Sequence, residues 1–225
     1  MGYRLTAAFI LGTMKLYWVK THKLIKKLFS GFVWDIPGRT KTVYLTFDDG
    51  PIPEATPWVL DILKQHNIKA TFFCIGDNIH KHPDTFKQVI GAGHTIGNHT
   101  FNHLNGWNTD NETYIANFEK CEATIQEEYN GEAKLFRPPY GRIKSAQAAV
   151  LRELGYKIIM WDVLSADFDQ TITPQQCLQN VIGTVTDGSI IIFHDSVKAS
   201  ANLRYALPKA IEYLKQNSYE FGVIA

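Results

Sequence analysis

Two histidines at a four-residue spacing, His99 and His103, are the first residues of this chain whose types and positions suggest chemistry. If the run 98–103 formed a helical turn, both imidazoles would lie on one face and could offer two nitrogens to a divalent ion. The spacing alone is a weak signal, because two partly exposed histidines in a loop would give the same pattern. A metal site is indicated only if the chain supplies a further ligand.

Two consecutive aspartates, Asp48 and Asp49, offer that ligand within the run 46–51, Thr-Phe-Asp-Asp-Gly-Pro. A carboxylate together with two imidazoles leaves positions open for water and substrate, which is typical of a catalytic rather than a structural zinc or related ion. One aspartate could bind the metal while the other acts as a base. Taken alone, the run also fits a plain turn in which an aspartate bonds to the backbone.

The elements that must position these residues alternate along the chain from residue 42 onward. Short runs rich in β-branched and aromatic residues predict strands at 43–47, 70–75, 95–98, 135–137, 158–162, 190–194 and 221–224. Helical periodicity predicts helices between them, at 56–66, 84–90, 112–129, 145–154, 174–185 and 203–216. This alternation predicts parallel strands joined by helical crossovers, and about seven strands fit a (β/α) barrel.

The polar residues with chemical potential follow the predicted strands. In (β/α) barrels the loops at the C-terminal ends of the strands carry the chemistry. The residues expected to converge on this rim are Asp48, Asp49, His99, His103, Arg137, Asp162, Asp167, His194 and Asp195.

Four ordered motifs resemble those of a known family. They are Thr-Phe-Asp-Asp-Gly at 46–50, His-Thr-Phe-Asn-His at 99–103, Arg-Pro-Pro-Tyr-Gly at 137–141 and Ile-Phe-His-Asp at 192–195. The chain resembles the polysaccharide deacetylases, the NodB-homology domain or carbohydrate esterase family 4, over about residues 42–224. The resemblance implies an irregular (β/α) barrel of seven or eight strands with a shallow groove, in agreement with the predicted elements.

The resemblance also implies a metal site and a base. Asp49, His99 and His103 match the residues that bind a divalent cation in the family, usually zinc and sometimes cobalt or nickel. Asp48 matches the general base, and Arg137 would pair with Asp48 and keep it ionised.

The remaining chemistry implied by the family falls on the later motifs. His194 matches the acid that protonates the leaving amine, and Asp167 matches the partner that orients it, in preference to Asp162. The backbone N–H of Tyr140 would stabilise the oxyanion of the tetrahedral intermediate. The family pattern has a tryptophan after the partner aspartate, whereas this chain has Phe168, which leaves the shape of the groove wall open.

Three further residues are candidates for substrate contact. Pro139 lies in the motif that shapes the approach of substrate to the oxyanion donor, and Ile192 matches the apolar residue that lines a pocket for the acetyl methyl group. Trp107 could stack on a sugar face, although aromatic residues more often pack in a core or at its rim.

Composition excludes other classes of protein. The 225 residues contain 23 Lys or Arg and 22 Asp or Glu, a formal net charge of +1, which argues against a protein that coats nucleic acid. Three cysteines form no CxxC pair, so we expect buried free thiols rather than a disulfide framework or a thiolate zinc site.

The charge is unevenly distributed along the chain. Residues 1–41 hold eight basic residues and one acidic residue, so a basic, partly helical N-terminal extension carries +7 and the domain expected at 42–225 carries −6. The apolar run 5–11 is too short to span a bilayer and is a weak secretory signal, and Met14 could be an alternative start. Residues 14–29 could form a helix packed on the domain with a solvated lysine face, which we favour over a helix on a membrane surface.

These observations predict a metal-dependent hydrolase that acts on carbon–nitrogen bonds other than peptide bonds. It would remove N-acetyl, or less often O-acetyl, groups from an acetylated aminosugar polymer or oligomer such as peptidoglycan or chitooligosaccharide. A small-molecule amidohydrolase and a catalytically silent carbohydrate-binding relative are the alternatives. A silent relative would typically lack the base, a ligand or the acid, and this chain has all of them. The sequence leaves the individual substrate, the oligomeric state and the localisation open.

Overall fold

Eight short strands form one curved, parallel sheet in the computed structural model, which describes residues 17–38, 40–131 and 133–225. The strands are β1 (Thr42–Asp48), β2 (Thr71–Cys74), β3 (Thr95–Asn98), β4 (Leu135–Phe136), β5 (Lys157–Ile158), β6 (Val163–Leu164), β7 (Ile190–His194) and β8 (Glu220–Gly222). Their order is β5-β4-β3-β2-β1-β7-β6, and β8 pairs with β1 beside this path. The predicted irregular (β/α) barrel is confirmed.

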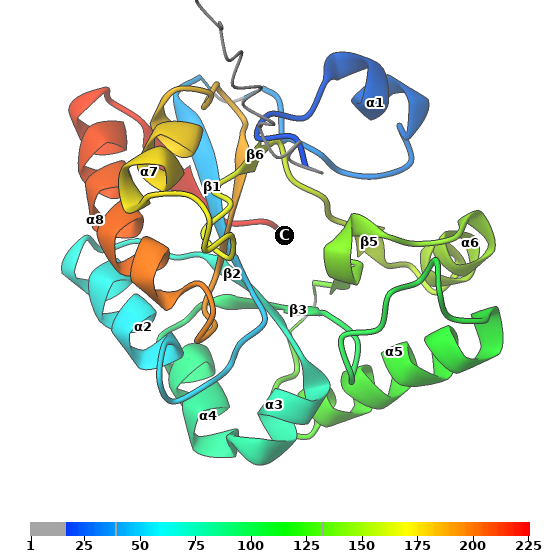
Figure 1. Cartoon of the computed structure of the whole chain (residues 1–225). Helices are drawn as coiled ribbons and strands as arrows, with labels where there is room; N and C mark the ends of the chain where they lie inside the picture. Colours follow the sequence, from blue (N-terminus) through cyan, green and yellow to red (C-terminus); the bar gives the residue numbers. More distant parts are fainter. Residues whose placement is uncertain (1–16, 39, 132) are drawn as a thin grey trace, which may run out of the picture.

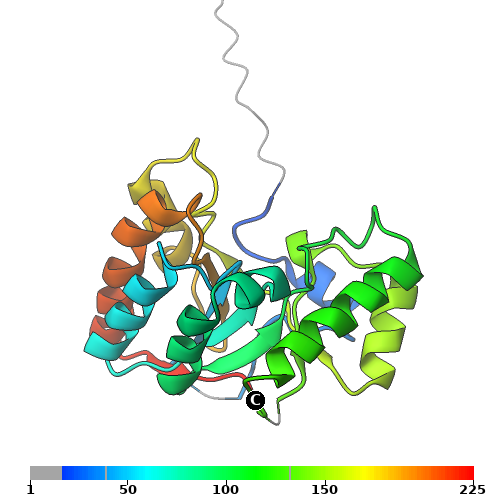
Figure 2. The same cartoon turned by 90° about the horizontal axis from the view of Figure 1, so that it is seen from below.

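Helices cover the outside of the sheet. They are α1 (Lys23–Leu28), α2 (Thr56–Gln65), α3 (Gly76–Lys81), α4 (Pro83–Gly91), α5 (Asn111–Gln126), α6 (Ser145–Glu153), α7 (Pro174–Ile182) and α8 (Ser200–Gln216), with a short 3₁₀ turn at Pro139–Gly141. Figures 1 and 2 show α2, α4, α7 and α8 along one half of the curved sheet and α5 and α6 along the other half. Helix α1 is set apart from both groups (Figure 1).

The central strands are buried because helices cover one face and the barrel interior lies on the other. All seven residues of β1 are buried, as are the four apolar residues 190–193 of β7, which fits strands without polar alternation. The Phe47 ring stacks on Phe72 and Phe193 from the two neighbouring strands, at centroid distances of 5.0 and 6.2 Å. In this register Asp48 pairs with His194 across β1 and β7, so two polar strand ends meet at one rim.

Most predicted elements are confirmed, with two differences. The strands predicted at 95–98 and 190–194 have the observed bounds. Only the start of the strand predicted at 158–162 is observed, in β5, because Ile159 pairs with Val33 of the N-terminal segment, and the short strand β6 beyond it was missed. Helix α3 was missed, since a glycine at its start and only six residues give a poor helical pattern.

The N-terminal segment joins the two edges of the open sheet. Val33 forms a bridge to Ile159 next to β5, and Lys20 forms a bridge to Val163 in β6. Residues 17–38 therefore lie where a closed barrel would have its missing strands. The apolar run 5–11 and the start at Met14 lie outside the described residues.

The predicted packing of the N-terminal helix was wrong. Helix α1 covers only Lys23–Leu28, and Tyr17 lies outside it. Leu24 and Leu28 are exposed instead of packed, while Lys26 points inward to Asp35 and Asp162. The inward side of this helix is therefore ionic, because an acidic residue of the barrel lies beneath it.

The cysteine prediction is confirmed, since Cys74, Cys121 and Cys177 are buried free thiols. Among the described helices, none has the length and apolar character needed to cross a membrane.

A buried carboxylate anchors the N-terminal segment. Both oxygens of Asp162 accept from lysines, Oδ2 from Lys20 and Oδ1 from Lys26, at 2.5 Å each, and Ser189 donates a third hydrogen bond. Burial acts to raise the pKa of Asp162, but the hydrogen bonds and charges of these partners outweigh it and lower the pKa. An unpaired charge at this depth would be costly, so the lysines and the carboxylate depend on one another.

We predict that Asp162→Asn lowers the free energy of unfolding by ~2–4 kcal/mol, because it removes the buried counterion of Lys20 and one of the two carboxylates that pair with Lys26. Urea denaturation at neutral pH measures the effect. Lys81→Gln, which removes the exposed pair between Lys81 and Asp77, is the control and should cost ~0–1 kcal/mol. Equal unfolding midpoints for Asp162→Asn and wild type would show that this cluster does not hold the segment.

Candidate metal centre and active site

Consecutive aspartates face the same site because the backbone turns between them. In a strand, neighbouring side chains point to opposite faces. Asp48 is the last residue of β1, and Asp49 follows it with a φ of 80°, in the left-handed region that non-glycine residues seldom occupy. Their carboxylates consequently both approach His99, with Asp48 Oδ2 at 3.7 Å and Asp49 Oδ1 at 3.8 Å from Nε2.

A buried ion pair holds Asp48. Arg137, just after β4, is fully buried and its Nη1 donates to Asp48 Oδ1 at 2.7 Å. The other guanidinium hydrogen bonds go to Thr46 Oγ1 and to the carbonyl oxygens of Ile159 and Met160. Asp48 therefore lies opposite a fixed positive charge, as predicted from the sequence.

The two histidines lie together, but not on a helical turn. Thr100 and His103 both have positive φ, 63° and 55°, and the loop is irregular. Side chains hold it in shape: Asn98 Oδ1 accepts from the Thr100 N–H, and Asn117 Oδ1 accepts from two further N–H groups of the loop. The helical turn expected at 98–103 was wrong, because these amides satisfy the backbone in a different conformation.

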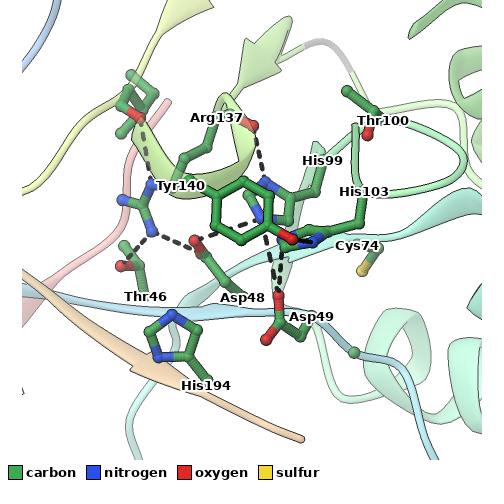
Figure 3. A network of polar contacts seen from close by, with 12 residues as sticks. Thr46, Asp48, Asp49, Cys74, His99, Thr100, His103, Arg137, Tyr140 and His194 are labelled. Carbon is green, nitrogen blue, oxygen red and sulfur yellow. Dashed lines mark hydrogen bonds and ion pairs between the residues drawn. The ribbon is translucent and has the colours of Figure 1, made fainter. Parts of the chain in front are cut away.

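The ligand atoms of Asp49, His99 and His103 all lie within 4.8 Å of one another. His99 Nδ1 lies 2.7 Å from the carbonyl oxygen of Arg137, which can only accept, so Nδ1 carries the proton and Nε2 faces the aspartates with a free lone pair. His103 Nε2 lies 3.3 Å from Asp49 Oδ1 (Figure 3). One carboxylate and two imidazoles at this separation fit a divalent ion such as zinc.

Burial favours neutral imidazoles at this cluster. Burial and the neighbouring His103 hold the pKa of His99 well below its usual value. Burial also lowers the pKa of His103, although the charges of Asp49 and Asp48 act in the opposite direction. A neutral imidazole is the form that ligates a metal, so the electrostatics agree with the geometry.

A second acid–base pair lies on the opposite side of the aspartates. Figure 3 shows Asp48 and Asp49 between His194 and the two histidines of the cluster. His194 Nδ1 lies 2.7 Å from Asp167 Oδ1, and its backbone N–H donates to the other oxygen of Asp167. Burial alone would lower the pKa of His194, but the charge and hydrogen bond of Asp167 raise it to about 9. His194 is therefore protonated at neutral pH.

Asp195 was predicted to lie on the rim of the barrel, and the structure shows that it supports the aspartate turn. Its carboxylate accepts from the Gly50 N–H at 3.1 Å and from the Thr56 hydroxyl at 2.5 Å, and its own N–H donates to the carbonyl oxygen of Asp48. A Cβ at Gly50 would lie 2.0 Å from this carboxylate, which explains the glycine. The one sequence feature that could have indicated this role of Asp195 is its position directly after His194.

A cavity of about 520 Å³ opens over these groups. Asp48, Asp49, His99, His103 and His194 line it, together with Tyr17, Tyr140, Arg142, Trp161, Leu164, Phe168, Ile192 and Lys198. Ile192 therefore lies where the sequence predicted. Tyr140 has a φ of 60°, an exposed ring, and a hydroxyl 3.1 Å from His103 Nδ1. Pro139 is buried behind it and does not line the cavity.

The structure places Trp107 outside the cavity. Its indole N–H donates to the carbonyl oxygen of Ile143, and Arg142 lies over its ring at 5.2 Å. Tyr17 and Phe168 form an aromatic wall of the cavity that the sequence analysis did not predict. Their rings meet edge to face at a centroid distance of 5.8 Å. Phe168, in place of the tryptophan of the family pattern, indicated that the cavity wall differs from that of the family. No local pattern indicated Tyr17, because it lies more than a hundred residues from Phe168 in the sequence.

Comparisons with known proteins agree with this geometry. The sequence profile of the polysaccharide deacetylase family matches residues 35–159. A peptidoglycan-N-acetylglucosamine deacetylase of Bacillus cereus is 35% identical over 198 residues, which are 87% of this chain and 92% of that protein.

Solved structures show the same fold. The crystal structure of a peptidoglycan N-acetylglucosamine deacetylase superposes with a TM-score of 0.82 at 34% identity, over 86% of this chain and 91% of that one. A family 4 pseudoenzyme from Bacillus anthracis superposes with a TM-score of 0.77 at 27% identity, over 85% of this chain and 66% of that one. The protein therefore belongs to the polysaccharide deacetylase family, carbohydrate esterase family 4, and is a hydrolase acting on carbon–nitrogen bonds other than peptide bonds.

Proposed function

We propose that this protein removes N-acetyl groups from N-acetylglucosamine units of a glycan of the peptidoglycan type, with a divalent metal as cofactor. The observation that carries the proposal is the placement of an aspartate paired with a buried guanidinium, three candidate metal ligands and a histidine paired with a buried aspartate around one cavity. Similarity to peptidoglycan deacetylases supports the choice of glycan.

Asp49, His99 and His103 would hold the metal. A bound divalent cation would polarise the acetamide carbonyl and lower the pKa of water at the site. The hydrogen bond from His99 Nδ1 to the Arg137 carbonyl would keep its Nε2 directed at the site before any ion arrives.

Asp48 would act as the general base. Its Oδ1 is occupied by the Arg137 guanidinium, while Oδ2 faces the cavity, 3.7 Å from His99 Nε2. When water attacks the acetamide carbon, Oδ2 is the oxygen placed to accept its proton. The ion pair with Arg137 fixes this orientation and supplies a compensating positive charge.

His194 would act as the general acid. The tetrahedral intermediate expels the amine only after the nitrogen is protonated, so an acid is needed across the cavity from the base. His194 carries a proton at neutral pH because Asp167 stabilises the imidazolium, and Asp167 also fixes the ring through Nδ1. Transfer of the Nε2 proton to the amine, with cleavage of the carbon–nitrogen bond, gives acetate and a free amino sugar.

The substrate would be positioned by the walls of the cavity. Tyr140 has a left-handed backbone conformation, so its N–H points in a direction that a helical or extended residue would not give it. This direction supports the Tyr140 N–H as the oxyanion donor. Ile192 would contact the acetyl methyl group, and the edge-to-face pair of Tyr17 and Phe168 would contact a sugar ring.

At least one protein with this fold is a pseudoenzyme, and a silent protein of this kind would typically lack the base, a metal ligand or the acid. This chain supplies a candidate base, a candidate acid and three candidate metal ligands, and Asp48, His194 and His99 each have a buried hydrogen-bond partner or ion pair. That completeness favours an active enzyme.

We expect the purified protein to release acetate from peptidoglycan and from chitooligosaccharides when a divalent metal is present. Asp48→Asn should lower kcat by ~10²–10⁴, because the base is lost while its shape is kept. Acetate release and metal content, measured on the same samples, test this prediction.

Wild-type acetate release by Asp48→Asn with metal bound would remove Asp48 as the base. No acetate from any glycan, with release from small amides, would instead favour an amidohydrolase. His80→Ala, at an exposed histidine outside the cavity, serves as the matched control and should retain wild-type activity.

We also expect kcat/KM to fall as the pH rises through about 9, because His194 must be protonated to act as the acid. Asp167→Asn removes the charge that raises this pKa, so the alkaline limb should move to lower pH by ~1–3 units. The pH profiles of kcat/KM for wild type and Asp167→Asn test the assignment. An alkaline limb at the same pH in both proteins would contradict it.

A further inference from the structure

A cluster of exposed apolar and basic side chains lies on the N-terminal segment. Leu24 is 74% exposed, Leu28 71%, Trp18 60% and Phe29 46%, and the exposed Lys23 and Lys27 lie beside them. We call these six residues the N-terminal patch. Leu24 and Leu28 are neighbours on one face of α1, and neighbouring exposed apolar side chains mark an interaction site more often than single ones do.

The orientation of α1 keeps this patch outward. Leu24 and Leu28 are four residues apart and share one face of the helix, while Lys23 and Lys27 share the adjacent face. Lys26 lies on the opposite side, where it pairs with Asp35 and the buried Asp162. Because that ion pair fixes the inward side, the leucines cannot turn toward the barrel without leaving a buried carboxylate poorly paired. Figure 1 shows α1 apart from the helices that cover the sheet.

The charge around the patch selects the kind of partner. Asp35 is the first acidic residue of the sequence and pairs with Lys26, and among the ion pairs of the described residues none involves Lys23 or Lys27. Residues 1–16 contain Arg4 and Lys15 and no acidic residue, so their charge does not complement the patch. A second copy would bring the same positive charge against it. The complementary surface is anionic with an apolar layer beneath.

We propose that the N-terminal patch docks on the surface of an anionic lipid bilayer. Leucine, tryptophan and phenylalanine side chains enter the boundary between headgroups and acyl chains, and lysines beside them contact anionic headgroups. The patch is small, so the docking is reversible and depends on both parts. Binding of this kind differs from spanning the membrane, and it requires no long apolar helix.

Docking would also place the catalytic cavity near the bilayer. Trp18 directly follows Tyr17, which lines the cavity. If the proposed deacetylase function holds, the enzyme would act on glycan close to a membrane surface. The docking itself does not depend on that function, and its test needs no activity measurement.

Vesicle flotation of the full chain tests the proposal. The probes are vesicles of phosphatidylcholine with phosphatidylglycerol and vesicles of phosphatidylcholine alone. We expect binding to the anionic vesicles and at least ~tenfold weaker binding to the neutral ones.

Leu24→Ser with Leu28→Ser should weaken anionic binding by more than ~tenfold, because both apolar contacts are lost. Lys23→Gln with Lys27→Gln should weaken it by ~fivefold for each lysine, and added salt should weaken wild-type binding in the same direction.

A matched variant controls for the loss of any exposed apolar pair. Val150 and Leu154 have the same four-residue spacing at α6 and are exposed, so Val150→Ser with Leu154→Ser should leave vesicle binding unchanged. Urea unfolding midpoints of all variants should equal that of wild type, since the altered side chains are exposed.

Three outcomes would overturn the proposal. The first is no wild-type binding to anionic vesicles. The second is equal binding by wild type and the leucine variant, which would assign the binding to residues 1–16 or to general charge. The third is a dimer, seen by light scattering, that the leucine variant abolishes while vesicle binding persists, which would assign the patch to self-association.

Discussion

The buried guanidinium of Arg137 is the interaction on which the active-site geometry depends. A charge without access to water is stable in a protein only if it is paired and its donors are satisfied. Arg137 meets both conditions, because Asp48 supplies the charge and Thr46, Ile159 and Met160 accept its other donors. Side chain and backbone then act together. The side chain orients the proposed base, and the carbonyl oxygen fixes the tautomer of His99, so one residue after β4 links the base to the proposed metal ligands.

The sequence was sufficient to predict most of the strands, such as β7, which is apolar from Ile190 to Phe193. It also predicted that the strand ends would meet, and the pairing of Asp48 with His194 across β1 and β7 shows why. The conformation of the loops was beyond such patterns. Asp49, Thr100, His103 and Tyr140 all have positive φ, although none is glycine. These conformations are held by distant partners such as Asp195 and Asn117, and no local spacing reveals them.

The basic N-terminal segment illustrates the same limit. Its charge was visible in the composition, but its position was not, because Lys20 and Lys26 pair with Asp162 more than 130 residues away. The segment bridges the sheet edges near β5 and β6, adds Tyr17 to the cavity wall and carries the exposed patch. Two of the lysines that make the N-terminal segment basic therefore attach it to the barrel, through their ion pairs with Asp162.

Asp49, His99 and His103 are the proposed metal ligands, and they lie beside Asp48, the proposed base. The most direct test is the divalent metal content per chain, measured by elemental mass spectrometry after zinc loading and removal of free ion. We predict one equivalent in wild type and far less than one in His99→Ala. Equal metal content in His99→Ala and wild type would contradict it.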